Sequence, residues 1–307
     1  MEISAMNILV TGSAGFLGNR LATRLATAGH TVYGLEHDRA NGTSRYNVVK
    51  GSITEYARIL EILVNFEIDQ VYHCASKAIV RNCVADPVGC INTNVLGTAI
   101  VLEACRQWGG VSGVMCMESD KAYGPSSEAY SEDTPLRPVA IYEASKACVS
   151  HLVATYRNNF SLPVFGVRSA NLYGPHDPNR SRLVPHSIDR LNNGQRPEIV
   201  DGAEYFVREF LFVDDASTAI VKLMDAEPWG QSINIGNESK MTIRDAISVI
   251  CESFGADDNF DILPRKKNFT EIPHQSVLCG KMHELTGYRP PTSFSDGIRL
   301  TVDEEMA

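Results

Sequence analysis

The sequence lacks the features that mark several classes of protein. Its 307 residues contain no basic run, no internal repeat and no low-complexity segment. There are 28 lysines and arginines against 37 acidic residues, which gives a formal net charge of −9. An acidic chain without a basic cluster is a poor candidate for binding nucleic acid or an anionic membrane. No apolar run reaches membrane-spanning length and the first predicted strand begins near the N-terminus, so we expect a cytoplasmic protein without a membrane anchor.

The cysteines also lack a pattern that would indicate a metal site or a disulfide framework. None of the eight forms a C-x-x-C pair, and several lie in apolar segments. They are Cys74, Cys83, Cys90, Cys105, Cys116, Cys148, Cys251 and Cys279. We therefore expect reduced thiols in the core of a cytosolic protein, with no metal bound.

What the chain does have is a regular alternation of strands and helices up to residue 170. Hydrophobic residues make up 44% and charged residues 21%, which is enough for a large core. Strands are predicted at 7–10, 31–35, 48–49, 70–74, 114–117 and 164–168, and helices at 16–28, 54–66, 87–107 and 141–159. In the third helix, Val88, Ile91, Val95, Leu102 and Cys105 are expected to share the packed face. The alternation predicts an α/β fold with a doubly wound parallel sheet, of Rossmann type.

The stretch TGSAGFLG follows the first strand and opens the first helix. Glycines at Gly12, Gly15 and Gly18 allow a tight turn and a close approach of a pyrophosphate to the helix N-terminus. The loop residues Ala14, Phe16 and Leu17 are assigned to the same cofactor site. The alternative is a turn whose glycines serve only its geometry.

Glu36 ends the second strand at the distance expected for a carboxylate that binds the cofactor ribose. It would accept a hydrogen bond from the 2′-hydroxyl and repel a 2′-phosphate, which favours NAD over NADP. Asp38 and Arg39 follow closely, and an arginine there can accommodate a 2′-phosphate, so NADP stays open as the less favoured cofactor.

After residue 170 proline, glycine, asparagine and aspartate become dense and the predicted strands become short. We therefore divide the chain into an NAD-binding Rossmann domain at 1–170 and a smaller lobe at 171–307. The segment 213–235 looks like a helix and a strand, and we expect it to return to the first domain.

The stretch YEASK places Tyr142 and Lys146 four residues apart, so on a helix they share a face. A lysine cation favours the phenolate and lowers the pKa of the phenol, which makes a base able to take a proton from an alcohol. Ser119, at the end of a neighbouring strand, is a candidate to hold the same alcohol. The alternative is a surface tyrosine and lysine on an amphipathic helix.

These motifs together resemble the extended short-chain dehydrogenase/reductases that act on nucleotide sugars. The resemblance covers nearly the whole chain and rests on TGSAGFLG, HCAS at 73–76, NTNVLGT at 92–98, ESDKAYG at 118–124, YEASK, NLYGP at 171–175 and REFLFVDD at 208–215. It implies a Rossmann lobe that binds NAD, a C-terminal lobe that binds a nucleoside-diphosphate sugar, and catalytic Ser119, Tyr142 and Lys146 between them. It also implies a homodimer, in which the helices at 87–107 and 141–159 pair with their twofold mates in a four-helix bundle.

Matching the family motifs residue by residue extends both predicted sites. Cofactor contacts are assigned to Ser52, Ile53, Ala75 and Asn94, and substrate contacts to Lys77, Asn171, Arg182 and Arg208. Asn94 would support the proton network, and Arg208 suits a diphosphate because its planar fork pairs with phosphate oxygens. One departure is Gly51-Ser52-Ile53, where many relatives have G-D-[IL], so we expect a contact to the adenine to be lost or altered.

Asp120 and Lys121 distinguish activities within this family. Family 4-epimerases usually have small uncharged residues there, whereas 4,6-dehydratases have an acidic residue followed by a base. The Ser-Asp-Lys order is similar to the branch of CDP-glucose 4,6-dehydratases. The resemblance implies oxidation at C4, removal of the C5 proton by Lys121, protonation of the C6 hydroxyl by Asp120 and return of the hydride to C6. The alternatives are a local ion pair in an epimerase or decarboxylase, and a regulator that binds a dinucleotide without catalysis.

Overall fold

The computed structural model describes residues 5–37, 45–265 and 271–306. Its centre is a seven-stranded sheet, and every neighbouring pair of strands in it is parallel. The order is β10 (Ser232–Ile235), β6 (Val164–Ser169), β5 (Gly113–Met117), β4 (Gln70–His73), β1 (Asn7–Thr11), β2 (Thr31–Glu36) and β3 (Asn47–Lys50). The predicted Rossmann-type parallel sheet is confirmed.

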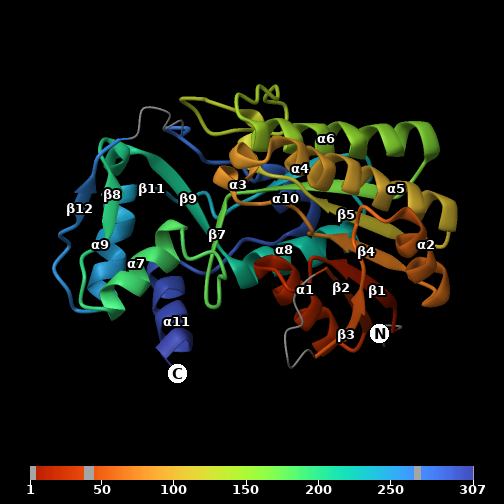
Figure 1. Cartoon of the computed structure of the whole chain (residues 1–307), viewed down its shortest axis with the longest axis horizontal. Helices are drawn as coiled ribbons and strands as arrows, with labels where there is room; N and C mark the ends of the chain where they lie inside the picture. Colours follow the sequence, from red (N-terminus) through yellow and green to blue (C-terminus); the bar gives the residue numbers. More distant parts are fainter. Residues whose placement is uncertain (1–4, 38–44, 266–270, 307) are drawn as a thin grey trace.

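Helices cover both faces of this sheet (Figure 1). One layer contains α2 (Tyr56–Asn65), α5 (Gly97–Trp108) and α6 (Ile141–Phe160); the other contains α1 (Phe16–Thr27), α8 (Val213–Ala226) and α10 (Gly280–Thr286). These helices pack on the sheet because their apolar residues are spaced one turn apart. In α1, for example, Leu17, Leu21 and Leu25 lie on one stripe and are buried. The strands are apolar on both faces, as a sheet covered on two sides requires.

The helix predicted at 87–107 is interrupted. It consists of α4 (Pro87–Ile91), a π-helical turn η1 (Asn92–Leu96) and α5. The wider turn changes the helical phase, so Val88 is 69% exposed although Leu102 and Cys105 are buried as predicted. By length and composition alone, the 22 residues from Pro87 to Trp108 could span a membrane, so the expectation that no apolar run reaches that length is wrong. In this fold the run packs on α2 and α6.

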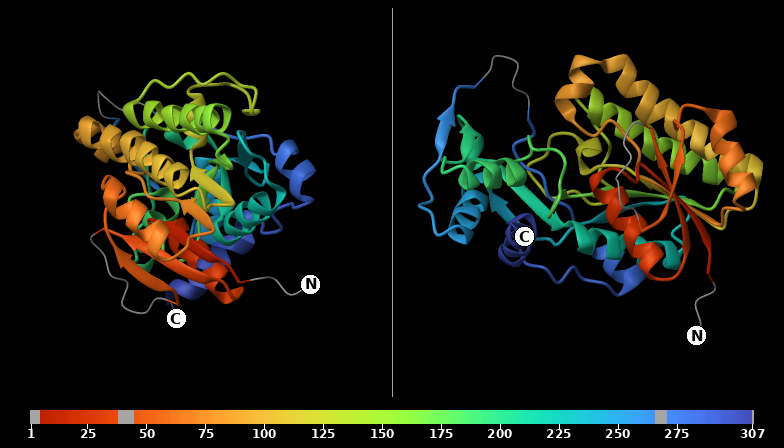
Figure 2. Two further views of the ribbon diagram at one scale, coloured as in Figure 1. Left: turned by 90° about the vertical axis from the view of Figure 1, so that its right-hand side faces the viewer. Right: turned by 60° about the horizontal axis from the view of Figure 1, so that its bottom comes forward.

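The second lobe lies beside the carboxyl ends of the central strands (Figure 2). It has a three-stranded sheet of β11 (Lys240–Thr242), β9 (Val207–Phe212) and β7 (Asn171–Tyr173), and a strand pair of β12 (Asp261–Leu263) and β8 (Glu198–Val200). Its helices are α7 (Leu183–Asn192), α9 (Ile243–Ser253) and α11 (Phe294–Met306). They enclose an aromatic core that includes Tyr173, Phe210, Phe212 and Phe294.

Two later segments of the chain, 213–235 and 280–286, pack with the large sheet. Strand β10 pairs with β6, and α8 packs on the same sheet face as α1. Helix α10 also packs on α8 and β10, although it lies more than a hundred residues after β6 in the sequence. The last third of the chain therefore crosses between the lobes more than once.

All eight cysteines are free. Six are buried, Cys74 is half-buried and Cys148 is exposed. The expectation of core thiols is therefore wrong for Cys148, because its position on α6 faces away from the sheet.

Candidate active site

A cavity of about 590 Å³ lies at the carboxyl ends of the central strands, between the two lobes. Strand β1 has β2 on one side and β4 on the other, so the chain reverses its winding there, and ligands of such sheets bind in the crevice at that point. The large lobe contributes the glycine loop, the segment after β4, the end of β5 and one face of α6. The second lobe contributes residues 171–173, 179 and 181–185, with Arg208, Phe210, Ile243 and Glu271.

The glycine loop has the geometry that the sequence predicts. Gly12 has φ +70°, and a Cβ there would lie 2.8 Å from the backbone of Ala75. A Cβ on Gly18 would lie 2.2 Å from the carbonyl oxygen of Gly12. Gly15 is the N-cap of α1, whose first turn carries no acidic residue. The open N-terminus of α1 therefore suits an anion such as a pyrophosphate.

Glu36 is buried at the end of β2, next to this loop. Its Oε1 accepts a hydrogen bond from Ser13 Oγ at 3.4 Å, and its Oε2 lies 3.8 Å from Lys50 Nζ. Oε2 has no hydrogen-bond partner although it is buried. A buried carboxylate oxygen that lacks a donor fits a ribose hydroxyl, so these residues suit NAD. Asp38 and Arg39 lie outside the described residues.

The other residues assigned to the cofactor are placed in different ways. Phe16, Leu17 and Ala75 line the cavity, whereas Ala14, Ser52, Ile53 and Asn94 do not. Ile53 packs against Gly97, and the Ser52 hydroxyl lies 2.8 Å from that of Thr54.

Asn94 lies in the π-helical turn and joins two parts of the site. Its Oδ1 accepts from the backbone of Lys77 at 2.7 Å, and its Nδ2 donates to Ser145 Oγ at 2.9 Å. Asn94 therefore holds the loop after β4 against α6. Lys77, assigned to the substrate, is off the cavity wall, and its Nζ pairs with Asp86 at 2.5 Å.

Tyr142 and Lys146 both line the cavity, one turn apart on α6, with Ser119 nearby. Lys146 Nζ donates to the carbonyl of Met117 at 2.8 Å, and burial lowers the pKa of Lys146 to about 8. Burial raises the pKa of Tyr142 to about 12, and the Ser119 hydroxyl and the Arg182 charge act in the opposite direction. The sequence predicted that Lys146 lowers this pKa. The structure corrects that expectation, because burial has the largest effect on the pKa of the phenol and raises it.

Asp120 and Lys121 belong to the short helix η2 (Asp120–Tyr123), for which Ser119 is the N-cap. Asp120 is buried, Lys121 is half-buried, and both line the cavity. Burial raises the pKa of the Asp120 carboxyl, against the effect of Lys121, and lowers the pKa of the Lys121 amine, against the effect of Asp120. The two shifts favour a neutral acid next to a neutral base.

A glutamine that sequence reasoning missed lies between these two side chains. Lys121 Nζ donates to Gln275 Oε1 at 2.9 Å, and Gln275 Nε2 donates to Asp120 Oδ2 at 3.5 Å. Gln275 is fully buried and lies 154 residues after Lys121. No local motif marks it, so only the fold could have identified it.

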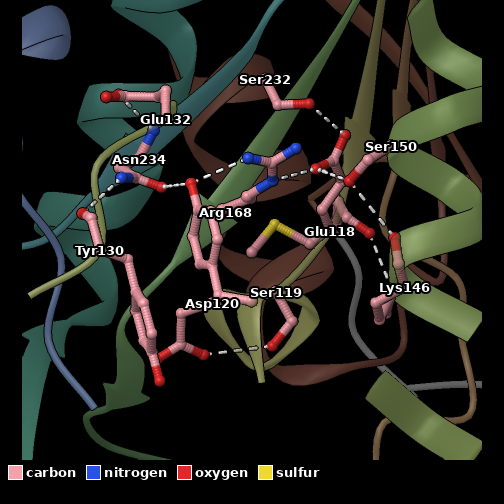
Figure 3. Close-up of polar contacts among 12 residues, drawn as sticks. Glu118, Ser119, Asp120, Tyr130, Glu132, Lys146, Ser150, Arg168, Ser232 and Asn234 are labelled. Carbon is pink, nitrogen blue, oxygen red and sulfur yellow. Dashed lines mark hydrogen bonds and ion pairs between the residues drawn. The ribbon is translucent and has the colours of Figure 1, made fainter. Parts of the chain in front are cut away.

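A buried ion pair, one partner of which lines the cavity, was also missed (Figure 3). Glu118 Oε2 lies 2.8 Å from Arg168 Nε and accepts from Ser150 Oγ at 2.5 Å, and its Oε1 accepts from Ser232 Oγ at 2.8 Å. A Cβ at Gly166 would lie 1.8 Å from Glu118 Oε1, so the glycine makes room for the carboxylate. The sequence does carry a signal, since both charges stand at the ends of predicted strands.

The polar residues assigned to the substrate from the second lobe line the cavity and have protein partners. Arg208 is buried, and its Nη2 lies 2.8 Å from Glu271 Oε1. Arg182 Nη1 lies 3.2 Å from Asp177 Oδ2, and Asn171 Nδ2 donates to the carbonyl of Glu209 at 3.2 Å. Two guanidinium groups and an amide at one wall give this side of the cavity the chemistry of a diphosphate site.

Within the part of the chain that the structure describes, no group of three or more histidine, cysteine, aspartate or glutamate side chains could hold a metal ion. His73 lies between the hydroxyls of Thr11 and Thr98, at 2.7 and 3.0 Å, and burial lowers its pKa to about 3. It is a neutral structural residue in β4.

Comparisons with known proteins agree with this architecture. The model of the NAD dependent epimerase/dehydratase family matches residues 8–236. A UDP-glucose 4-epimerase from Mycolicibacterium smegmatis is 29% identical over 311 residues, which cover 97% of this chain and 98% of the relative. A dTDP-glucose 4,6-dehydratase from Streptomyces antibioticus is 30% identical over 316 residues, which cover 97% of this chain and 92% of the relative.

Solved structures of both activities have the same fold. The UDP-glucose 4-epimerase from Thermotoga maritima with UDP-glucose has a TM-score of 0.90 at 26% identity, over 98% of this chain and 99% of that one. The dTDP-glucose 4,6-dehydratase from Streptomyces venezuelae with NAD and TDP bound has a TM-score of 0.89 at 27% identity, over 98% of this chain and 97% of that one.

Proposed function

This chain belongs to the NAD-dependent epimerase/dehydratase family, its cofactor is NAD, and we propose that it is a nucleoside-diphosphate-hexose 4,6-dehydratase. The observation that carries the proposal is the pair formed by Asp120 and Lys121 on the cavity wall, next to Tyr142. Water elimination needs one group that gives a proton and one that takes a proton, and the pKa of each side chain is moved toward the form required. Epimerisation at C4 needs neither group.

The residues of the large lobe are assigned to the first half of the reaction. Bound NAD supplies the acceptor for the hydride of C4 and later its donor to C6. Tyr142 Oη takes the proton of the C4 hydroxyl and Ser119 Oγ holds that hydroxyl, while Ser119 and Arg182 are the groups that favour the phenolate against burial.

The second half of the reaction, water elimination, is assigned to Asp120 and Lys121 of η2. The C4 ketone acidifies the C5 proton, which Lys121 Nζ removes as a neutral amine. Asp120 gives its proton to the C6 hydroxyl, which leaves as water, and Lys121 returns the C5 proton when the hydride is added to C6. The diphosphate of the substrate is assigned to Arg208, Arg182 and Asn171, and its charge would replace the pairing of Arg208 with Glu271.

A 4-epimerase of the same family is the second candidate, because relatives of that activity match as well as dehydratases do. The two are separated by incubating the NAD-bound protein with UDP-, CDP-, GDP- and dTDP-hexoses and measuring product masses. A 4,6-dehydratase gives a product lighter by one water and no net reduced cofactor. A product of unchanged mass with altered configuration at C4 would establish the epimerase instead.

We also propose a homodimer through the helices on the α6 side of the sheet. The described residues there expose apolar side chains that one sheet face does not require, namely Val84, Val88, Leu96 and Val139. Sedimentation at micromolar concentration is expected to give twice the chain mass, and Val88→Asp combined with Leu96→Asp is expected to give monomers. A wild-type monomer at that concentration would contradict the proposal.

A further inference from the structure

Gln275 contacts both groups assigned to water elimination but does not line the cavity. Its amide oxygen accepts from Lys121 Nζ and its amide nitrogen points to Asp120 Oδ2. In this orientation each partner meets the complementary half of the amide, because Lys121 Nζ carries N–H donors in both its charged and neutral forms and Asp120 Oδ2 can accept in both of its forms.

The backbone around Gln275 is fixed by the second lobe and by the loop after η2. The backbone N–H of Gln275 donates to the backbone carbonyl of Val207, at the start of β9, at 3.0 Å. The amide of Val277 donates to Glu209 Oε2 at 2.9 Å, and Tyr130 forms a β-bridge with Val277. The Gln275 side chain therefore has a fixed origin, and its fully buried amide has little freedom to turn.

We propose that Gln275 is the positioning residue of the elimination step, and this proposal rests on the dehydratase function. By accepting one N–H of Lys121, its oxygen aims the remaining substituents of Nζ into the cavity, so the lone pair of the neutral amine faces the sugar. By donating to Asp120 Oδ2, its nitrogen leaves the acidic proton to Oδ1, the oxygen that lies 3.3 Å from Ser119 Oγ. An amide neither gains nor loses a proton near neutral pH, so it orients both groups without exchanging protons with them.

Other charges act on the same pair and must stay constant in a test. Among the described residues, the charges with the largest effect on Lys121 are Asp120 on η2, Glu143 on α6, Arg208 on β9 and Glu271. The groups that Asp120 itself affects include Tyr130, Tyr142 and Glu209. Substitutions of Gln275 change none of these residues.

Two substitutions of similar length should move Lys121 in opposite directions. Gln275→Glu places a carboxylate next to the amine, which favours the ammonium and raises its pKa. Gln275→Met removes the acceptor, so the ammonium is held less well and the pKa falls. In the NAD-bound enzyme, both variants should lose water elimination by a factor on the order of 100, because the base is misaligned or charged.

The pH profile separates this role from a structural one. The acid limb of the elimination rate should move to higher pH in Gln275→Glu and to lower pH in Gln275→Met. Ser276→Ala is the matched control, since the neighbouring Ser276 hydroxyl is buried without a hydrogen-bond partner. It should leave both rate and profile unchanged. Limbs that stay in place, or that move in the same direction in both Gln275 variants, would overturn the proposal.

A second measurement does not depend on the reaction. Trace acetylation with acetic anhydride, quantified at Lys121 by mass spectrometry as a function of pH, reports the pKa of the amine in the NAD-bound protein. Opposite shifts in the two variants support the contact with Gln275 even if no nucleotide sugar loses water, in which case the proposed function fails alone. Water loss by the wild type together with unshifted acetylation curves would overturn the role of Gln275 and leave the dehydratase in place.

Discussion

Among the residues that the structure describes, Lys121 and Lys146 are the lysines that line the cavity, and the structure supports them in different ways. Lys146 Nζ is bound to the carbonyl of Met117, and the ion pair of Glu118 and Arg168 lies behind it, so its support comes from the seven-stranded sheet and α6. Lys121 Nζ is bound to Gln275, which the second lobe holds. The comparison teaches that the groups assigned to oxidation are organised within the large lobe, whereas those assigned to elimination depend on contacts between the lobes.

The largest expected effect comes from replacing Tyr142, because elimination can follow only after the oxidation that Tyr142 is proposed to start. Tyr142→Phe removes the phenol oxygen, so the C4 hydroxyl proton has no acceptor, and turnover should fall by a factor on the order of 10,000. No near-ultraviolet absorbance of reduced nicotinamide should appear after substrate is added. Tyr205→Phe, at a tyrosine that is 73% exposed, is the control and should behave as wild type. Wild-type turnover by Tyr142→Phe would remove Tyr142 from the reaction.

Replacing Lys121 should separate oxidation at C4 from water elimination. Lys121→Met keeps the length of the side chain and removes the base, so water loss should slow by a factor on the order of 100 to 10,000 while oxidation survives. The bound cofactor should then accumulate in its reduced form, seen as near-ultraviolet absorbance. Asp120→Asn should stop at the same stage, because an amide does not supply the proton. Lys240→Met, on the exposed edge of β11, is the matched control. Full water loss by Lys121→Met would remove the main support for a dehydratase.

Replacing Glu118 tests the support within the large lobe. Glu118→Gln leaves the Arg168 guanidinium buried without its ion-pair partner, so the free energy of unfolding in urea should fall by about 3–5 kcal/mol. The Glu118 charge raises the pKa of Lys146 against the effect of burial, so in this variant that pKa should fall below about 8. The alkaline limb of the oxidation rate should then move to lower pH.

A double variant keeps this test independent of folding. Glu118→Gln with Arg168→Met removes both charges and should recover most of the lost stability, while the alkaline limb stays shifted. An unchanged limb in both variants would show that Glu118 supports the fold and not Lys146.

The sequence predicts the local parts of this site better than the parts that meet across the fold. The strand ends, the glycine turn and the spacing of Tyr142 and Lys146 follow from periodicity, because each depends on residues close together in the chain. The raised pKa of Tyr142 could not be predicted from periodicity, since it depends on which residues bury the phenol. Gln275 was invisible because its partners lie 154 and 155 residues away. The π-helical turn at 92–96 was missed because the apolar spacing around it resembles that of a regular helix.

The smallest expected effect tests the support between the lobes, through the pH dependence of stability. Glu209 is fully buried, its two oxygens accept from the backbones of Val277 and Glu238, and burial raises its pKa to about 7 from 4.5. A carboxyl whose pKa is higher in the folded chain favours folding while it is protonated. That contribution is complete below about pH 4.5 and is lost as the pH rises through about 7.

The measurement is the free energy of unfolding in urea for wild type and Glu209→Gln between pH 5 and pH 8. The difference between the two proteins should change by about 1–3 kcal/mol over this range, with the wild type losing stability relative to the variant as the pH rises. Groups such as His73, whose pKa burial lowers to about 3, are present in both proteins and cancel. Glu128→Gln, at an exposed position in the loop after η2, should run parallel to wild type. If Glu209→Gln also runs parallel, the segment that carries Gln275 is held independently of Glu209, and its support is not sensitive to pH in this range.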